Sequence, residues 1–229
     1  RMYLPVERIN LVQKYVGADG HAPALDRLGG QSWEKVKRKT RELILAMARE
    51  LLEVHAARAS LGRPSVPPLG EEYEEFVARF PFEETSGQRA AIEDVIADLR
   101  SDKIMDRLVC GDVGYGKTEV ALRAAFVAVQ NGKQVAVLVP TTILAQQHAE
   151  TFTRRFADYP IKIELLNRFR SAQESKLVVQ GLAAGTVDIV IGTHRLLQRD
   201  VVFKNLGLIV VDEEHRFGVS HKEKIKKIR

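Results

Sequence analysis

The chain has 229 residues, 45% hydrophobic and 28% charged, a composition typical of a globular protein that buries a core. No apolar run approaches the ~20 residues of a membrane span, no signal-peptide pattern opens the chain, and one cysteine excludes an internal disulfide, so we expect a cytoplasmic protein without a membrane partner. The net charge of +5 arises in residues 1–69, where 12 Lys and Arg outnumber 7 Asp and Glu, and we interpret it as a solvated basic helix face.

The first 70 residues predict two segments ahead of the main domain. Residues 1–30 begin with a strand end and a short amphipathic piece, followed by a loop rich in glycine, and we interpret them as the remnant of an upstream domain. From Ser32, a candidate N-cap, apolar residues recur at helical spacing until about Gly62, and Trp33 is expected to be a packing anchor. The stretch GRPSVPPLG then predicts a linker, so that residues 31–70 form one long helix and a linker.

Residues 71–229 predict a doubly wound, mostly parallel α/β domain. After a short helix at 71–79, Thr85 and Gln88 have capping-box spacing before an apolar-periodic run. Strands are expected at 107–110, 134–139, 161–165, 187–191 and 207–212, and helices at about 117–130, 142–157, 172–183 and 220–228. Runs such as QVAVLV and LGLIVV are apolar on both faces, which is typical of parallel strands covered by helices on both sides. Cys110, at the end of the first run, is expected to be a core thiol.

The stretch GDVGYGKT, residues 111–118, matches the phosphate-binding pattern G-x-x-x-x-G-K-[ST] and lies between a strand-like run and a helical one. Backbone N–H groups of such a loop point at phosphate oxygens, and the positive end of the following helix adds to the attraction. Lys117 is expected to contact the β- and γ-phosphates and Thr118 to bind Mg²⁺. The loop comprises Gly111, Asp112, Val113, Gly114, Tyr115 and Gly116. The alternative is a glycine turn with a surface lysine.

A second candidate site lies in LGLIVVDEEH, residues 206–215, where a buried parallel strand ends in two carboxylates. Open α/β sheets bind ligands at the carboxyl ends of their strands. We expect Asp212 to hold Mg²⁺, through water, and Glu213 to orient and activate the attacking water. Alone, this pattern is equally well explained by an exposed strand end. Together with the phosphate loop it predicts hydrolysis of a nucleotide, with ATP and Mg²⁺ as cofactors.

Five motifs follow one another in a fixed order along the chain: FEETSGQ (82–88), the phosphate loop, PTTILAQQH (140–148), IGTHRLLQ (191–198) and DEEHRFG (212–218). In this set and order, residues 80–219 resemble the helicase and DNA translocase branch of superfamily 2. The resemblance implies a RecA-like motor lobe in which Lys117, Asp212 and Glu213 serve ATP hydrolysis. It also implies that Gln88 reads the adenine, with Phe82 or Phe80 packed near the base.

The same resemblance implies a surface for double-stranded DNA that grips the backbone without reading sequence. Its residues are expected to be Thr141, Thr142, Thr193, His194 and Arg195, while Glu214 and His215 couple the nucleotide site to the DNA site. Arg168 and Arg170 are placed either on this surface or in ion pairs with Glu164 and Glu174. The histidines show no metal-ligand spacing, and polar or coupling roles are expected for them.

A narrower resemblance, to the bacterial transcription-repair coupling factors, rests on residues 106–126, RFRS, GTHRLLQ and 211–226, with RecG next most similar. The lead-in segments LPVERINLVQKYVG and LDRLGGQSWEKVK resemble the end of the RNA-polymerase-interacting domain and the connector helix after it. This implies a nucleoid-associated translocase that displaces stalled RNA polymerase and brings in nucleotide excision repair proteins.

The resemblance divides the chain into the end of the polymerase-interacting domain (1–30), a connector (31–70) and the first motor lobe (71–229). Because the second lobe and its arginine are not in this sequence, we expect the chain by itself to hydrolyse ATP at a near-background rate. Two alternatives stay open. One is the lobe of a RecG-like branched-DNA helicase, and the other is a polymerase-docking module with a passive motor scaffold.

Overall fold

The computed structural model of the chain describes residues 5–12, 31–60, 62 and 65–217. The chain divides into two compact units, Arg1–Ser60 and Leu61–Arg229, and each is described by itself. The predictions for the strand end at residues 2–4, for most of the loop at 18–31 and for the helix at 220–228 lie outside the described residues. No helix among the described segments is both long enough and apolar enough to cross a membrane.

The first unit is helical. A short 3₁₀ helix, η1 (Val6–Leu11), precedes the long helix α1 (Gln31–Ser60), whose existence the sequence predicts. Gln31 is already helical, so the prediction of Ser32 as the N-cap is wrong by at least one position. The prediction of Trp33 as a packing anchor is also wrong, because its side chain is exposed along with Val36, Leu43 and Ile44.

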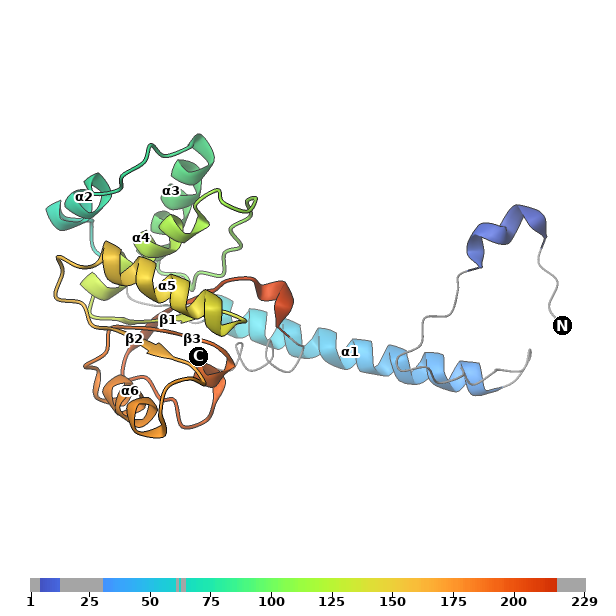
Figure 1. The fold of residues 1–229 in the computed structure, drawn as a ribbon. Helices are drawn as coiled ribbons and strands as arrows, with labels where there is room; N and C mark the ends of the chain where they lie inside the picture. Colours follow the sequence, from blue (N-terminus) through green and yellow to red (C-terminus); the bar gives the residue numbers. More distant parts are fainter. Residues whose placement is uncertain (1–4, 13–30, 61, 63–64, 218–229) are drawn as a thin grey trace. The chain divides into compact units, whose positions relative to one another are not determined.

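The second unit is a lobe built on a parallel sheet, as the sequence predicts, although the sheet has four strands instead of the five expected (Figure 1). Its helices are α2 (Glu71–Ala78), α3 (Ser86–Arg100), α4 (Lys117–Gln130), α5 (Thr142–Arg155) and α6 (Ala172–Ala184). Its strands are β1 (Gln134–Leu138), β2 (Ile163–Leu166), β3 (Ile189–Gly192) and β4 (Leu206–Val211), in the order β2-β3-β1-β4. Two 3₁₀ turns follow strands, η3 (His194–Leu197) after β3 and η4 (Glu214–Arg216) after β4.

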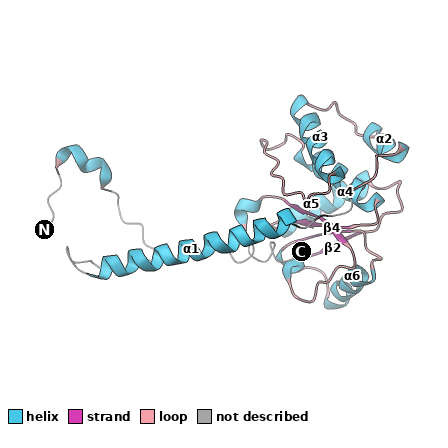
Figure 2. Cartoon of the chain, turned by 180° about the vertical axis from the view of Figure 1, so that it is seen from behind, coloured by secondary structure: helices cyan, strands magenta, loops and turns pink. Residues whose placement is uncertain are grey.

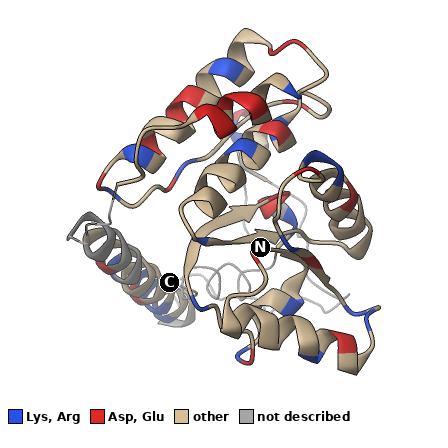
Figure 3. Cartoon of the chain, turned by 90° about the vertical axis from the view of Figure 1, so that its left-hand side faces the viewer, with Lys and Arg blue, Asp and Glu red and all other residues tan. Residues whose placement is uncertain are grey.

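The two faces of the sheet bury different sets of helices, as alternation along a strand requires. Val135 and Val137 of β1 belong to the larger core cluster, with residues of α2, α3, α4 and α5. Ala136 and Leu138, which point the other way, belong to the smaller cluster with residues of α6 and η3. In Figure 1, α4 and α5 accordingly lie on one side of the sheet and α6 on the other. Surface charges of both signs are spread over the lobe, with four glutamates on α2 (Figure 3).

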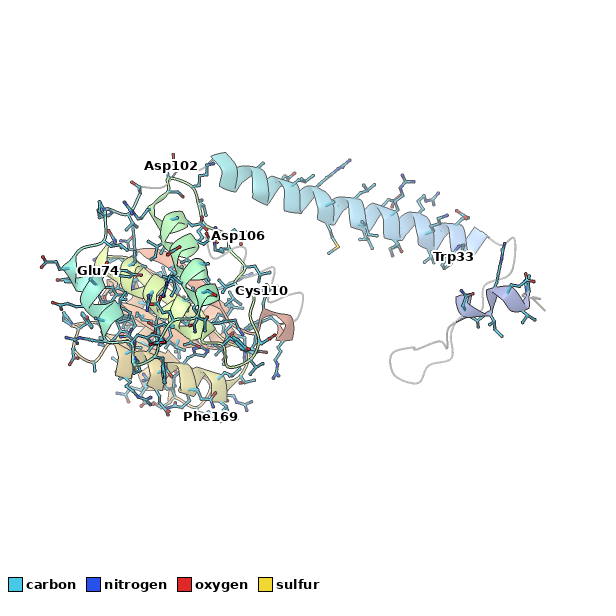
Figure 4. The ribbon with its side chains drawn as sticks, turned by 90° about the horizontal axis from the view of Figure 1, so that it is seen from above. Trp33, Glu74, Asp102, Asp106, Cys110 and Phe169 are labelled. Carbon is cyan, nitrogen blue, oxygen red and sulfur yellow. The ribbon has the colours of Figure 1, made fainter. Side chains whose placement is uncertain are left out.

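The prediction of a strand at 107–110 is wrong. The whole segment between α3 and α4 is loop (Figure 2), and Leu108 is 79% exposed. Among the described residues, no strand pairs with the outer edge of β4, so an apolar run at 107–110 has no ladder to join. Arg107 instead binds Asp94 and Asp98 of α3 through its guanidinium. Cys110 is consequently exposed, at the periphery of the lobe in Figure 4, and the prediction of a core thiol is wrong as well.

The amino end of the sheet is held by one buried amide. Gln134, at the start of β1, donates through Nε2 to the carbonyls of Leu182 (3.0 Å) and Val187 (2.8 Å). Its Oε1 accepts from the N–H of Asn205 (2.9 Å). The side chain thereby satisfies backbone groups at the end of α6, before β3 and before β4. The candidate site residues follow the opposite end of the sheet, where the strands finish.

Candidate nucleotide and DNA sites

The phosphate loop owes its shape to two glycines in the left-handed region. Gly114 has φ +85° and Gly116 has φ +67°, and Gly116 is also the N-cap residue of α4. An L-residue at φ near +60° is strained. A Cβ on Gly116 would in addition lie 2.3 Å from Nε2 of Gln88. The loop therefore has a specific backbone conformation and ends at the N-terminus of α4, where the sequence predicts the start of a helix.

Lys117 folds back over this loop. Its Nζ donates to the carbonyl oxygens of Gly111 (2.7 Å) and Asp112 (2.8 Å). The ammonium is thus placed inside the curve of the backbone. Val113 and Tyr115 point outward and are exposed, so the outer side of the loop is open to solvent.

Gln88 joins the loop to the start of α3. Its Oε1 accepts from the N–H of Thr85 (2.8 Å), while the Thr85 hydroxyl accepts from the N–H of Gln88 (3.2 Å). This is the predicted capping box. The Nε2 of the same amide donates to the carbonyl of Tyr115 (2.9 Å). One side chain therefore fixes both the helix start and the phosphate loop.

Asp212, directly after β4, is held by two hydrogen bonds. The ring Nε2 of His148, on α5, donates to Asp212 Oδ2 (2.8 Å), and the N–H of Glu213 donates to Oδ1 (2.9 Å). The hydrogen bond from His148 is the main reason that the pKa of Asp212 lies below its usual range, although partial burial acts the other way. The charge of Lys117 lowers this pKa as well, so the lysine of the loop and this carboxylate lie within electrostatic reach of each other.

Glu213 has a strained backbone. Its φ of +52° is the only positive φ of a non-glycine residue among the residues described. It is the N-cap residue of η4, and its Oε2 lies 3.3 Å from Nε of Arg216. Such outliers cluster at functional sites, where the surrounding structure holds them. Here the left-handed turn directs the chain away from the sheet immediately after Asp212. Glu214 is exposed, and the side chain of His215 lies outside the described residues.

The residues around the loop offer hard oxygen donors of the kind that Mg²⁺ takes. No three His, Cys, Asp or Glu side chains gather into a metal cage within the described part of the chain. Mg²⁺ at nucleotide sites is held by one or two protein oxygens together with phosphates and water. The Thr118 hydroxyl at the start of α4 and the ionised Asp212 carboxylate fit that requirement by their chemistry.

The residues predicted to contact DNA follow the ends of β1 and β3, which are neighbours in the sheet. Thr141 is the N-cap of α5 and its hydroxyl accepts from the N–H of Leu144 (3.2 Å), while Thr142 opens the helix. Thr193 is only 2% exposed, whereas His194 beside it is exposed. Arg195 forms a two-armed ion pair with Asp200, whose pKa it lowers. Their contact with DNA stays a prediction.

Arg168 and Arg170, for which the sequence left either a place on the DNA surface or an ion pair open, differ in the structure. Arg170 pairs with Glu164 (2.9 Å), one of the two partners that the sequence suggested. Glu174 instead completes a capping box with Ser171 at the start of α6. Arg168 is exposed and lies 5.1 Å from the ring of Phe169, which sits at the rim of the lobe in Figure 4. Arg168 is therefore the one of the pair whose charge stays available to a ligand.

A pocket of about 390 Å³ lies beside the segment that leads to Gln88. Its lining residues are Val77, Phe80, Phe82, Glu83, Glu84 and Arg89. The rings of Phe80 and Phe82 meet edge to face with centroids 5.6 Å apart, and Phe82 is 73% exposed. The pocket thus combines two aromatic rings with charged residues and lies next to the capping box that carries Gln88.

Sequence reasoning missed two features around these sites. One is the bond of His148 to Asp212, because a pairing 64 positions apart leaves no mark in local spacing. The other is a group of four charged side chains beside the pocket, Glu84, Glu119, Arg123 and Arg155. The available signal was the i, i+4 pair Glu119 and Arg123 inside an otherwise apolar helix, where charges are buried only when they are paired.

Comparison with known proteins shows which family the chain resembles. The chain is similar over its whole length to the transcription-repair coupling factors of Bacillus subtilis (54% identical) and Escherichia coli (52% identical), and it spans about 20% of the length of each. The structure of RecG bound to a three-way DNA junction matches 72% of this chain and 23% of that chain, with TM-score 0.67 and 40% identity.

A second solved structure, a hypothetical ATP-dependent RNA helicase from Sulfolobus tokodaii, matches 70% of this chain and 46% of that chain. Its TM-score is 0.54 at 20% identity, which shows the fold alone. The predicted RecA-like α/β fold and the predicted resemblance are thereby confirmed. The family model of the DEAD/DEAH box helicases matches residues 85–229, which is more than half of the chain. The chain therefore belongs to the DEAD/DEAH box helicase family.

Proposed function

We propose that the lobe is the ATP-binding part of a motor that moves along double-stranded DNA. The observation that carries this proposal is the meeting of two segments about a hundred positions apart. Lys117 of the phosphate loop and Asp212 after β4 lie within electrostatic reach at the carboxyl end of the parallel sheet. A cation on a phosphate-binding loop and an ionised carboxylate beside it are the two halves of a site for nucleotide hydrolysis.

The residues of the site would divide the work as follows. Lys117 exchanges the carbonyls of Gly111 and Asp112 for the β- and γ-phosphates, which charge attraction favours. Thr118 and Asp212 would hold Mg²⁺, which supplies neutralisation of the phosphate charge when it is bound. Glu213 orients the attacking water and accepts its proton. His148 keeps the Asp212 carboxylate ionised and fixed in direction.

The base would lie in the pocket of Phe80 and Phe82, with Gln88 near it, one residue before the pocket-lining Arg89. A pocket of about 390 Å³ falls within the range of small-ligand sites. The Gln88 amide has a donor and an acceptor, as the edge of adenine requires. In the structure, Oε1 of this amide accepts from the N–H of Thr85, and Nε2 donates to the carbonyl of Tyr115. The base would therefore bind through the second N–H of Nε2 and the second lone pair of Oε1, or it would displace one of these two hydrogen bonds.

The DNA surface would lie where β1 and β3 end. Thr141, Thr142, Thr193, His194 and Arg195 are grouped there by the strand order, and hydroxyls, backbone N–H groups and guanidinium groups are the groups that grip phosphates without reading sequence. Because Thr193 is only 2% exposed, it would reach a phosphate only after a local rearrangement. RecG, whose matching structure holds a DNA junction, is 40% identical to this chain over the shared part. Arg195 must release Asp200 to bind a phosphate, so its contribution depends on salt.

For the whole protein, we propose a role in coupling transcription to DNA repair, as the names of its relatives indicate. Relatives that are 52–54% identical over the chain are transcription-repair coupling factors. In such a parent, residues 71–229 would be the first motor lobe, 31–70 the connector, and 1–30 the end of the domain that meets RNA polymerase. The motor would push stalled polymerase off the DNA and bring in nucleotide excision repair proteins. The RecG match supports a second candidate, a helicase lobe for branched DNA.

The nucleotide site is tested by calorimetric titration of the 229-residue chain with ATP and Mg²⁺. We expect Lys117→Ala to lower the affinity at least tenfold, since a charge-assisted contact to phosphate is lost. Lys176→Ala, which removes an exposed lysine from α6, is the matched control and should bind as the parent does. Equal affinities for all three proteins would refute a phosphate site at this loop.

The two motor roles are separated with the full-length protein on plain duplex and on three-way junctions. A translocase that follows duplex should show ATP turnover stimulated by both, and Glu213→Gln should abolish it. Stimulation by junctions alone would favour the branched-DNA helicase instead.

A further inference from the structure

Four charged side chains meet beside the proposed base pocket, which one of them, Glu84, helps to line. Arg123 and Glu119 of α4 are buried, at 3% and 5% exposed, while Glu84 and Arg155 are half-buried. Nε of Arg123 donates to Glu119 Oε1 (3.1 Å), and its Nη2 lies 2.6 Å from Glu84 Oε1. Arg155, at the end of α5, donates to the same Glu119 oxygen (2.8 Å) and to the carbonyl of Phe76 (2.9 Å). Two glutamates and two arginines thus balance one another.

This group joins three segments that are remote in sequence, two of which belong to the proposed nucleotide site. Glu119 follows Thr118 of the phosphate loop, and α4 rises from that loop. Glu84 belongs to the segment between α2 and α3, directly before the Thr85–Gln88 capping box. Arg155 ends α5, the helix that begins at the predicted DNA contact Thr142. Figure 1 shows α2, α3 and α4 on the same side of the sheet.

The same arginines support the aromatic wall of the pocket. The guanidinium carbons of Arg123 and Arg155 each lie 5.8 Å from the centre of the Phe80 ring. Arg155 also lies 4.2 Å from the centre of the Phe76 ring, which is fully buried. Such cation–π contacts are strongest where water is excluded. Phe80 in turn supports the exposed Phe82 edge to face.

We propose that Arg123 is a positioning residue for the nucleobase, which it serves through its ion pair with Glu84 and its contact with Phe80. The pair ties the segment 80–88 to α4, and with it both the aromatic pocket and the amide of Gln88. Neither Arg123 nor Glu84 needs to touch the phosphates, which the loop holds by its own backbone. The inference rests on the proposed nucleotide site and adds to it a separate determinant of base affinity.

Glu84→Gln is the sharpest change, because it removes one charge at nearly constant volume and leaves the bond between Arg123 and Glu119 in place. With Glu84 neutral, Glu119 is the one carboxylate left in this group for the two guanidinium groups, so part of their charge loses its compensation. The segment 80–88 is then held less firmly to α4, while Lys117 and the loop glycines are unchanged. We therefore expect an effect on the base and none on the phosphates.

The experiment titrates the 229-residue chain with ATP and, separately, with inorganic tripolyphosphate, each with Mg²⁺. In Glu84→Gln we expect ATP affinity to fall about tenfold and tripolyphosphate affinity to stay within twofold. Arg123→Lys, which keeps the charge, should lose less ATP affinity than Arg123→Gln. Glu93→Gln, an exposed carboxylate on α3, is the matched control and should equal the parent.

The outcomes separate the proposals. If Glu84→Gln binds ATP as the parent does, or loses ATP and tripolyphosphate equally, the positioning role is refuted while the phosphate site stands. If the parent binds tripolyphosphate as tightly as ATP, there is no base contribution to position, and the inference fails alone. If the parent binds neither ligand, the proposed nucleotide site fails together with the inference.

Discussion

At the scale of single residues, the backbone of Gly116 couples two parts of the site. Gly116→Ala would put a Cβ at φ +67° and 2.3 Å from Nε2 of Gln88, so Gln88 must give up the carbonyl of Tyr115. We expect the strain, about 1–2 kcal/mol, and the displaced amide to lower ATP affinity at least tenfold. Gly111→Ala meets only the Lys117 stem at 3.6 Å and should lose much less. Comparable losses in the two variants, measured by calorimetry, would contradict this.

Asp212 provides a prediction on pH. Its pKa is lowered in the folded state, chiefly by the hydrogen bond from His148. A lowered carboxyl pKa contributes stability that is present above the unfolded value of about 3.9 and is lost as the pH falls through the folded value. The melting temperatures of the parent and of Asp212→Asn should therefore differ steadily from pH 6 to 5 and converge below about pH 4. A difference that persists unchanged to pH 3 would speak against an ionised, hydrogen-bonded Asp212.

At the scale of secondary-structure elements, the end of β3 allows no side chain. A Cβ on Gly192 would lie 2.3 Å from the carbonyl oxygen of Leu166 on β2 and 3.0 Å from Leu196. Gly192→Ala should therefore cost about 1–3 kcal/mol of unfolding free energy, as overpacking does. Gly87→Ala, in α3, meets nothing within 4 Å and should be neutral or stabilise by about 0.5–1 kcal/mol. Denaturant unfolding of both variants measures this, and equal stabilities would rule out the close approach of β2 and β3.

The elements also show how far the sequence alone can be read. Apolar runs and helical periodicity predict β1 to β4, α4, α5 and α6, because each of these elements has a complete set of packing partners. The capping box of Thr85 and Gln88 is predicted from spacing, since both residues lie in one helix turn. The run at 107–110 reads the same way but has no ladder partner among the described strands, and local sequence carries no information on that.

The candidate site divides in the same manner. The phosphate loop and Asp212 are predictable because each is one short segment with a fixed spacing. The bonds from His148 to Asp212 and from Arg123 to Glu84 join segments 64 and 39 positions apart, and only the folded chain brings them together. For Trp33 and Cys110 the prediction of burial is wrong. Their apolar character predicts a buried side chain, but both side chains are exposed.

At the scale of the whole molecule, the second unit contains both apolar cores found among the described residues. Their buried members all lie at or beyond Tyr73, and Val66 and Leu69 of the predicted linker are partly buried against the larger core. We therefore expect a chain of residues 61–229 to fold by itself and to melt within about 4 °C of the full 229 residues, equivalent to ~1 kcal/mol. Calorimetric melting of both chains tests this. A markedly lower melting temperature of the shorter chain would mean that residues 1–60 stabilise the lobe.

The left-handed backbone of Glu213 lowers the stability of the fold at a residue whose side chain is proposed to be needed for hydrolysis. A glycine there would release about 1–2 kcal/mol of strain, part of which its own freedom in the unfolded chain offsets. Glu213→Gly should thus melt no lower than the parent, yet it would lose the carboxylate proposed to activate water. A clear fall in melting temperature would contradict this. Any redesign that ranks variants by thermal stability alone would accept glycine at this position, and would thereby remove the carboxylate proposed to activate water without any warning from the melting temperature.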